Sequence, residues 1–255
     1  MPSVPSSDLE SLKYLTRFSY KSTMKLLAYV DILGFRELIK ELNEDESLTD
    51  DIVDGIGLFN DVAELIKTNP IVSVSFFSDL IVLSQPCDSL KSDPLILLSL
   101  LGSIQGVLLA NGYLSRGAVV MGKAVHNPLF LFGEALIEAY DLERHTAKYP
   151  RIIITDEAED IIKNNLLSLH STQAQNLSDK VMKRDFDGIR YLNFLAPLPA
   201  VSGRNIYSEI RESVVRELNK TRKNVNKYTK AYWLASYFNE TLREMKWPGV
   251  MEIPH

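Results

Sequence analysis

Two aspartates stand where neighbouring strands could bring their carboxylates together. Asp31 follows the apolar run KLLAYV, which is typical of a strand buried on both faces. Asp79 lies between the segments VSVSFF and LIVLS, which follow each other so closely that they must form an antiparallel hairpin. If that hairpin pairs with the first strand, both carboxylates reach the same sheet edge, on strands roughly 5 Å apart.

Two carboxylates beside a backbone carbonyl, here that of Ile32, form an oxygen-only site suited to Mg²⁺ or Mn²⁺. Two such ions, ~3.5–4 Å apart, would clamp the attacking and leaving oxygens of an in-line displacement. In the alternative interpretation, Asp31 ends a strand or caps a helix and Asp79 forms a turn, and spacing alone leaves both open. An unpaired charge at the end of an apolar run is costly, which favours the metal site.

The rest of the chain predicts the elements that must position these residues. Their order is β-α-α-β-β-α-β-α-β-α-β with two helices at the end, which indicates an α+β fold: a ferredoxin-like mixed or antiparallel sheet with helices on one face. The hairpin at 71–85 breaks the alternation that a doubly wound parallel sheet requires. Helices are expected at 35–43, 52–67, 88–111, 132–144, 156–167 and, as a pair, 205–245; later strands are expected at 113–125, 151–155 and 185–195.

We expect three parts in the chain: a flexible lead-in at 1–23, a catalytic domain at 24–200 and a C-terminal helical extension at 201–255. In the extension, Trp233, Tyr237 and Phe238 recur at helical spacing, as expected of a face that docks the tail. A run of basic residues precedes them and is interpreted as a solvated helix face. Its members are Arg216, Lys220, Arg222, Lys223, Lys227 and Lys230.

The composition excludes several classes. With 255 residues and one cysteine, Cys87, the chain has no disulfide framework and no cysteine-based zinc site. Its net charge of −5 disfavours broad binding to nucleic acid or anionic membranes. The longest apolar stretch, 94–110, is short of a membrane span, and the start lacks the apolar core of a secretory signal. We therefore expect a cytoplasmic protein.

Five segments resemble, in chain order, the motifs of class III nucleotidyl cyclases. YVDILGF is similar to their first metal-binding motif, and FFSDLIVLS to the hairpin with the second metal aspartate, although Ser78 replaces the usual glycine. LSRGAVVMG, LFGEALIEAYDLE and RIIITDEAEDII resemble the elements that follow, so the resemblance covers about 25–195. With DFDG and the tail KYTKAYWLASYFN, the whole pattern looks most like the bacterial Pycsar pyrimidine cyclases of anti-phage defence.

The resemblance implies a role for five residues. Asp31 and Asp79 would hold two divalent ions, Mg²⁺ or Mn²⁺, with the Ile32 carbonyl as a further ligand. Arg116 would bind triphosphate oxygens, for which a guanidinium is well shaped. Lys183 would be a second phosphate-binding residue. The family's sites lie between two protomers, so a homodimer is implied.

Besides Ser78, four positions depart from the family pattern. The usual transition-state Asn and Arg fall at Ile137 and Asp141, and the purine-reading Lys and Asp of adenylate cyclases fall at Ser75 and Phe130. The second departure argues against ATP and GTP and makes Ser75 and Phe130 candidates for contact with a pyrimidine. The loss of the transition-state Asn and Arg could mean an inactive domain, but Pycsar enzymes share much of this departure and are active.

The function expected from the resemblance is conversion of UTP to 3′,5′-cyclic UMP and pyrophosphate. The alternatives are a cytidylate cyclase, a catalytically inactive cyclase-like domain that binds nucleotide or a partner, and a cyclase with a purine product. The chain keeps Asp31, Asp79 and Arg116, whereas inactive relatives usually lose a metal carboxylate.

Overall fold

The structure is a computed structural model, in which the described residues fall into six ranges. The helix expected at 52–67 lies outside the described residues, as do the lead-in apart from residues 22 and 23 and the helix at 35–43 apart from residue 35. The described residues are 22–35, 71–87, 93–169, 174–196, 206–246 and 251–254.

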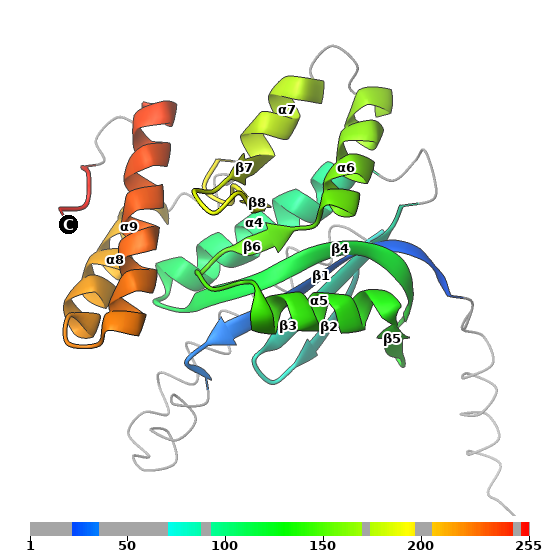
Figure 1. The fold of residues 1–255 in the computed structure, drawn as a ribbon, viewed down its shortest axis with the longest axis horizontal. Helices are drawn as coiled ribbons and strands as arrows, with labels where there is room; N and C mark the ends of the chain where they lie inside the picture. The colour runs from blue at the N-terminus through cyan, green and yellow to red at the C-terminus, as the bar shows by residue number, and fades with distance from the viewer. Residues whose placement is uncertain are drawn as a thin grey trace, which may run out of the picture.

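Among the described residues, eight strands form one mixed sheet in the order β2-β3-β1-β4-β6-β8-β7, with β5 paired to β4 (Figure 1). The β4–β6 pair is parallel and the other pairs are antiparallel. The expected α+β mixed sheet is therefore confirmed. The strands are β1 (Thr23–Leu33), β2 (Ser73–Phe77), β3 (Leu80–Pro86), β4 (Leu114–His126), β5 (Leu131–Gly133), β6 (Ile152–Ile154), β7 (Met182–Arg184) and β8 (Arg190–Leu192).

Helices cover both faces of this sheet, not one as expected. Alternate residues of β1 explain the difference: Leu27 belongs to a core beneath α5, whereas Leu26 and Ala28 belong to the core beneath α4, α6 and α8. A strand that is apolar on both sides needs cover on both sides. The helices are α4 (Pro94–Ala110), α5 (Glu134–His145), α6 (Asp156–Leu169), α7 (Ala174–Val181), α8 (Ile206–Thr221) and α9 (Val225–Met245).

Two further expectations were wrong in detail. Phe132 lies in strand β5 and not in a helix, because α5 begins only after Gly133. Gly133 has φ 144°, and a Cβ there would collide with the Lys123 carbonyl, so glycine permits this strand-to-helix junction. The strand expected at 185–195 is shorter, because residues 185–188 form the turn of a β7–β8 hairpin that was not predicted.

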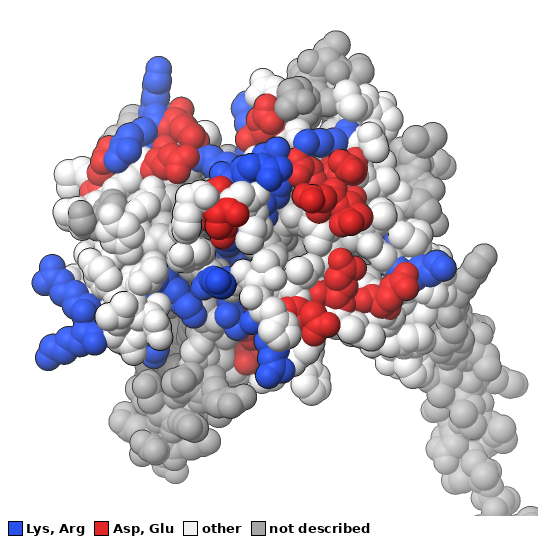
Figure 2. All heavy atoms as spheres, in the orientation of Figure 1, with Lys and Arg blue, Asp and Glu red and all other residues white. Residues whose placement is uncertain are grey.

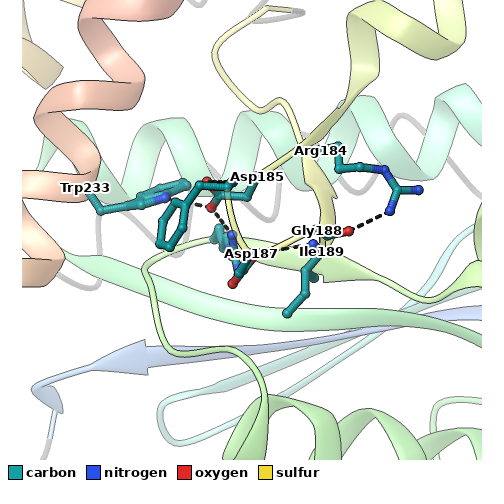
Figure 3. Close-up of polar contacts among 8 residues, drawn as sticks. Arg184, Asp185, Asp187, Gly188, Ile189 and Trp233 are labelled. Atoms are coloured by element: carbon teal, nitrogen blue, oxygen red, sulfur yellow. Dashed lines mark hydrogen bonds and ion pairs between the residues drawn. The ribbon is translucent and has the colours of Figure 1, made fainter.

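The C-terminal helices dock onto the sheet through the aromatic face expected from the sequence. Trp233 stacks on Tyr149 and Tyr237, and its Nε1 donates a hydrogen bond to Asp185 over 2.7 Å (Figure 3). The turn that carries Asp185 is held in shape by its own contacts: the Ile189 N–H donates to Asp187 and Arg184 donates to the Gly188 carbonyl. Helix α9 is thereby anchored to the β7–β8 hairpin.

Candidate active site

The structure brings Asp31 and Asp79 together at one edge of the sheet. Asp31 lies opposite Leu80, the residue after Asp79, because β1 pairs with β3. The Ile32 N–H donates a hydrogen bond of 2.9 Å to the Asp79 carbonyl, which ties the hairpin turn to β1. Ser78 adopts φ 57° in this turn, a conformation that costs a non-glycine residue roughly 1–2 kcal/mol. The turn therefore keeps a backbone shape that glycine would adopt without strain.

The two carboxylates create a local excess of negative charge. Burial raises the pKa of Asp31, the nearby Asp79 raises it further, and Arg116 lowers it. No group of three or more His, Cys, Asp or Glu side chains that could hold a metal ion occurs among the described residues. Mg²⁺ is commonly held by one or two carboxylates together with substrate phosphates. The hard oxygen donors of this pair fit such an ion.

Arg116 lies directly beside Asp31, since the two residues face each other in the β1–β4 register. Its Nε is 3.7 Å from Asp31 Oδ2 and 2.5 Å from Glu143 Oε1 on helix α5. Next to it, a Cβ at Gly117 would collide with the Tyr29 carbonyl, so glycine lets β1 and β4 approach. Arg116 is thus held by Asp31 of β1 and by Glu143 of α5.

Two residues of this charged cluster were not predicted from the sequence. Glu143 is buried, and its pKa is raised by that burial and by Asp31 but lowered by Arg116. Lys230 of α9 is half-buried; burial and Arg116 lower its pKa, whereas Asp31 raises it. Lys230 precedes Trp233 by three residues, and this helical spacing could have placed it on the docked face of α9.

The basic run of the extension is therefore divided. Arg222, Lys223 and Lys227 are exposed, as expected of a solvated face, and Figure 2 shows basic side chains protruding where α8 meets α9. Lys230 is instead half-buried, and Arg116, Asp31 and Glu143 all affect its pKa. The interpretation as a solvated face holds for the five exposed residues and fails for the half-buried Lys230; the five are Arg216, Lys220, Arg222, Lys223 and Lys227.

An apolar pocket adjoins the carboxylates. Its volume is about 690 Å³, and both Ser75 and Phe130 line it, so the structure brings these two candidates together. Leu80 and Tyr29 also line it, and because Leu80 lies opposite Asp31, the pocket and the aspartates are neighbours. Aromatic walls of this kind suit a flat ring.

Lys183 lies far from Asp31 and Asp79 in the sheet. It is on β7, which is separated from β1 by three strands, or about 19 Å at the usual strand spacing. Its Nζ is 2.7 Å from Glu244 and 3.3 Å from Glu240, both on α9. The structure does not bring Lys183 to Asp31 within one chain.

Comparisons with known proteins give matches among solved structures alone. No family model and no curated protein matches this sequence. The adenylyl cyclase CyaB from P. aeruginosa is 18% identical over 58% of this chain and 84% of its own, with a TM-score of 0.45. A bacterial light-regulated adenylyl cyclase is 14% identical over 82% and 68%, with a TM-score of 0.47. The guanylyl cyclase Cya2 is 14% identical over 56% and 79%, with a TM-score of 0.40.

No helix among the described residues is both long enough and apolar enough to cross a membrane.

Proposed function

We propose that this chain is a metal-dependent nucleotide cyclase of the class III type that converts UTP to 3′,5′-cyclic UMP and pyrophosphate. CTP is the second candidate substrate. The observation that carries the proposal is the Asp31–Asp79 pair, which lies beside a pocket lined by Ser75 and Phe130. The resemblance to Pycsar cyclases extends the proposal to second-messenger signalling in anti-phage defence, in the cytoplasm.

The reaction asks the protein for positioning and charge stabilisation. The ribose 3′-oxygen forms a bond to the α-phosphorus, the bond to the pyrophosphate oxygen breaks, and the 3′-hydroxyl proton is released. Asp31, Asp79 and the Ile32 carbonyl would hold two divalent ions, Mg²⁺ or Mn²⁺. Bound there, the ions would acidify the 3′-hydroxyl and neutralise the triphosphate.

When substrate binds, Arg116 would bind the triphosphate in place of Asp31 and keep its contact with Glu143. In the structure its guanidinium faces Asp31 and Glu143. A triphosphate offers oxygens that match the planar guanidinium fork, so Arg116 would bind the substrate while Glu143 keeps it oriented. Lys230 adds positive charge to the same cluster. Together they would stabilise the charge of the leaving pyrophosphate.

The pocket supports a pyrimidine. Phe130 is 40% exposed at the pocket wall and offers a ring face on which a base could stack. At position 75 the pocket has a small hydroxyl, and at position 130 it has an aromatic ring, in place of the charged pair that reads purines in adenylate cyclases. The choice between uracil and cytosine depends on hydrogen bonds within this pocket.

A homodimer completes the proposal. Large apolar side chains are exposed around the mouth of the pocket, on the β2–β3 hairpin, the β4–β5 turn and α5; a second copy would cover them. A second copy is also needed if Lys183 is to reach the aspartates. The exposed apolar residues are Phe76, Phe77, Leu129, Phe130, Phe132, Ile137 and Tyr140.

The proposed activity is tested by incubating the purified protein with Mn²⁺ and each of the four nucleoside triphosphates. We expect cyclic UMP, or else cyclic CMP, to be detected by mass spectrometry and to be lost in Asp79→Ala. A purine product would contradict the argument from Ser75 and Phe130. The absence of any product from the intact dimer would favour an inactive domain that binds nucleotide or a partner.

The proposed dimer is tested by substitution of Ile137, which is 64% exposed on α5 within the apolar surface. Ile137→Glu should convert the protein from a dimer to a monomer, because two buried carboxylates would face the partner without compensation. Light scattering after size exclusion measures the mass. Leu167→Glu is the matched control: Leu167 is similarly exposed but lies on α6, outside this surface, and its variant should remain dimeric. A monomeric wild-type protein would contradict the proposal.

A further inference from the structure

The hydroxyl of Ser75, at the wall of the proposed base pocket, is tied to a buried histidine. Ser75 Oγ on β2 lies 3.0 Å from Nε2 of His126 on β4. Nδ1 of the same ring lies 2.8 Å from Ser84 Oγ on β3. Ser84 is fully buried and His126 nearly so, so three strands bring a polar chain from the interior to the pocket.

The positions of the hydrogens in this chain follow from counting donors and acceptors. Burial, together with the charge of Lys25, lowers the pKa of His126 to about 4, so the ring is neutral at pH 7 and only one nitrogen carries a hydrogen. Among the described residues, the Ser84 hydroxyl has His126 Nδ1 as its hydrogen-bond partner. Were Nδ1 protonated, the Ser84 hydrogen would be buried without an acceptor, which costs free energy.

The favoured arrangement therefore runs in one direction. The Ser84 hydroxyl donates to His126 Nδ1, and His126 Nε2–H donates to Ser75 Oγ. Ser75 then accepts from the histidine and keeps its own hydrogen for another partner. Because Ser75 lines the pocket, that hydrogen is placed where a group of a bound molecule can accept it.

We infer that the hydrogen bonds from Ser84 through His126 hold the Ser75 hydroxyl as a hydrogen-bond donor toward the base. The site thereby selects a base with a carbonyl over one with an amino group. His126 is then a positioning residue for specificity. The inference rests on the proposed function. Uracil has a carbonyl acceptor at the exocyclic position where cytosine has an amino donor, and a site that leaves polar groups unpaired discriminates strongly. The device explains a preference for UTP over CTP.

The inference is tested by binding of two analogues that cannot cyclise, 3′-deoxy-UTP and 3′-deoxy-CTP, measured by calorimetry with Mg²⁺. The wild-type protein should prefer the uridine analogue. Ser75→Ala and Ser84→Ala should each narrow this preference about tenfold, which is the loss expected for one directed hydrogen bond. Ser84→Thr keeps the hydroxyl and should retain the preference. Ser213→Ala, at a buried serine of α8, is the matched control and should change neither affinity.

A nitrogen-15 spectrum of the histidine side chains tests the predicted tautomer of His126 without nucleotide. We expect Nδ1 of His126 to have the shift of an unprotonated nitrogen and Nε2 that of a protonated one. The opposite tautomer would overturn the inference, as would a Ser84→Ala variant that weakens both analogues equally. Binding of both analogues without preference overturns the inference alone. If neither analogue binds, the proposed function fails and the inference fails with it.

Discussion

Asp31→Asn should lower kcat/KM for the nucleotide at least about a thousandfold while leaving the fold intact. The substitution keeps the size of the side chain but removes one of the two carboxylates that would hold the divalent ions. Metal-ion catalysis contributes several kcal/mol of transition-state stabilisation, and each ~1.4 kcal/mol corresponds to tenfold in rate. Initial rates at saturating Mn²⁺ measure the loss.

Stability distinguishes this effect from damage to the fold. In the metal-free protein, burial and Asp79 both raise the pKa of Asp31, so its charge is held at a cost. An amide at this position removes that repulsion, and we expect a thermal midpoint equal to or above that of the wild type. Asp160→Asn, at an exposed position of α6, is the matched control and should change neither quantity. An Asp31→Asn variant that remained active would contradict the proposed metal site.

The hairpin and its aspartate were predictable because the information is local. The segments on either side of Asp79 are too close for a parallel connection, and the apolar run before Asp31 predicts a central strand, so their meeting required only pairing of neighbours. The structure has this pairing, with Asp31 opposite Leu80. Ser75 of β2 and Phe130 of the β4–β5 turn also line one pocket, but these two candidates came from the family resemblance and not from local pattern.

Glu143 and Lys230 were not predictable in the same way. Each is affected by the charge of Asp31, and each lies on a helix that is docked by residues other than the site residues. Helix α5 packs on the core beneath it, and α9 is anchored by Trp233. The sequence pattern of a basic run does not show whether the helix face that carries a given lysine is solvated or docked. Only the spacing to Trp233 distinguishes the two, and that spacing gains meaning once the docking surface on β7–β8 is known.

The docking surface depends on the buried cation Arg151. This residue has no exposed surface; its guanidinium pairs with Asp185 and Asp187 and lies 5.9 Å from the ring of Trp233. Burial alone would raise the pKa of Asp187, but the hydrogen bond from Arg151 and those from the backbone lower it. Asp185 in turn accepts the hydrogen bond from Trp233 (Figure 3). Arg151 therefore connects the sheet to α9, the helix that carries Lys230.

Arg151→Ala should lower the free energy of unfolding by about 3–5 kcal/mol, because the partly buried carboxylates of Asp185 and Asp187 lose their fully buried partner. Urea unfolding at pH 7 measures the loss. The wild type's advantage should shrink as the pH falls below about 4, because a carboxylate with a lowered folded pKa stabilises the fold above its unfolded pKa and loses that contribution on protonation.

The triple variant Arg151→Met, Asp185→Asn, Asp187→Asn is the matched control, since it removes the cation and both carboxylates together. Most of the lost stability should return, because the cost of Arg151→Ala lies in the uncompensated charges and not in the missing contact itself. The amide introduced by Asp185→Asn retains an oxygen that can accept from Trp233, so α9 should stay docked and Lys230 should stay near Asp31. A triple variant as unstable as Arg151→Ala would show that stacking of the guanidinium on the aromatic rings, and not charge compensation, holds this end of the fold.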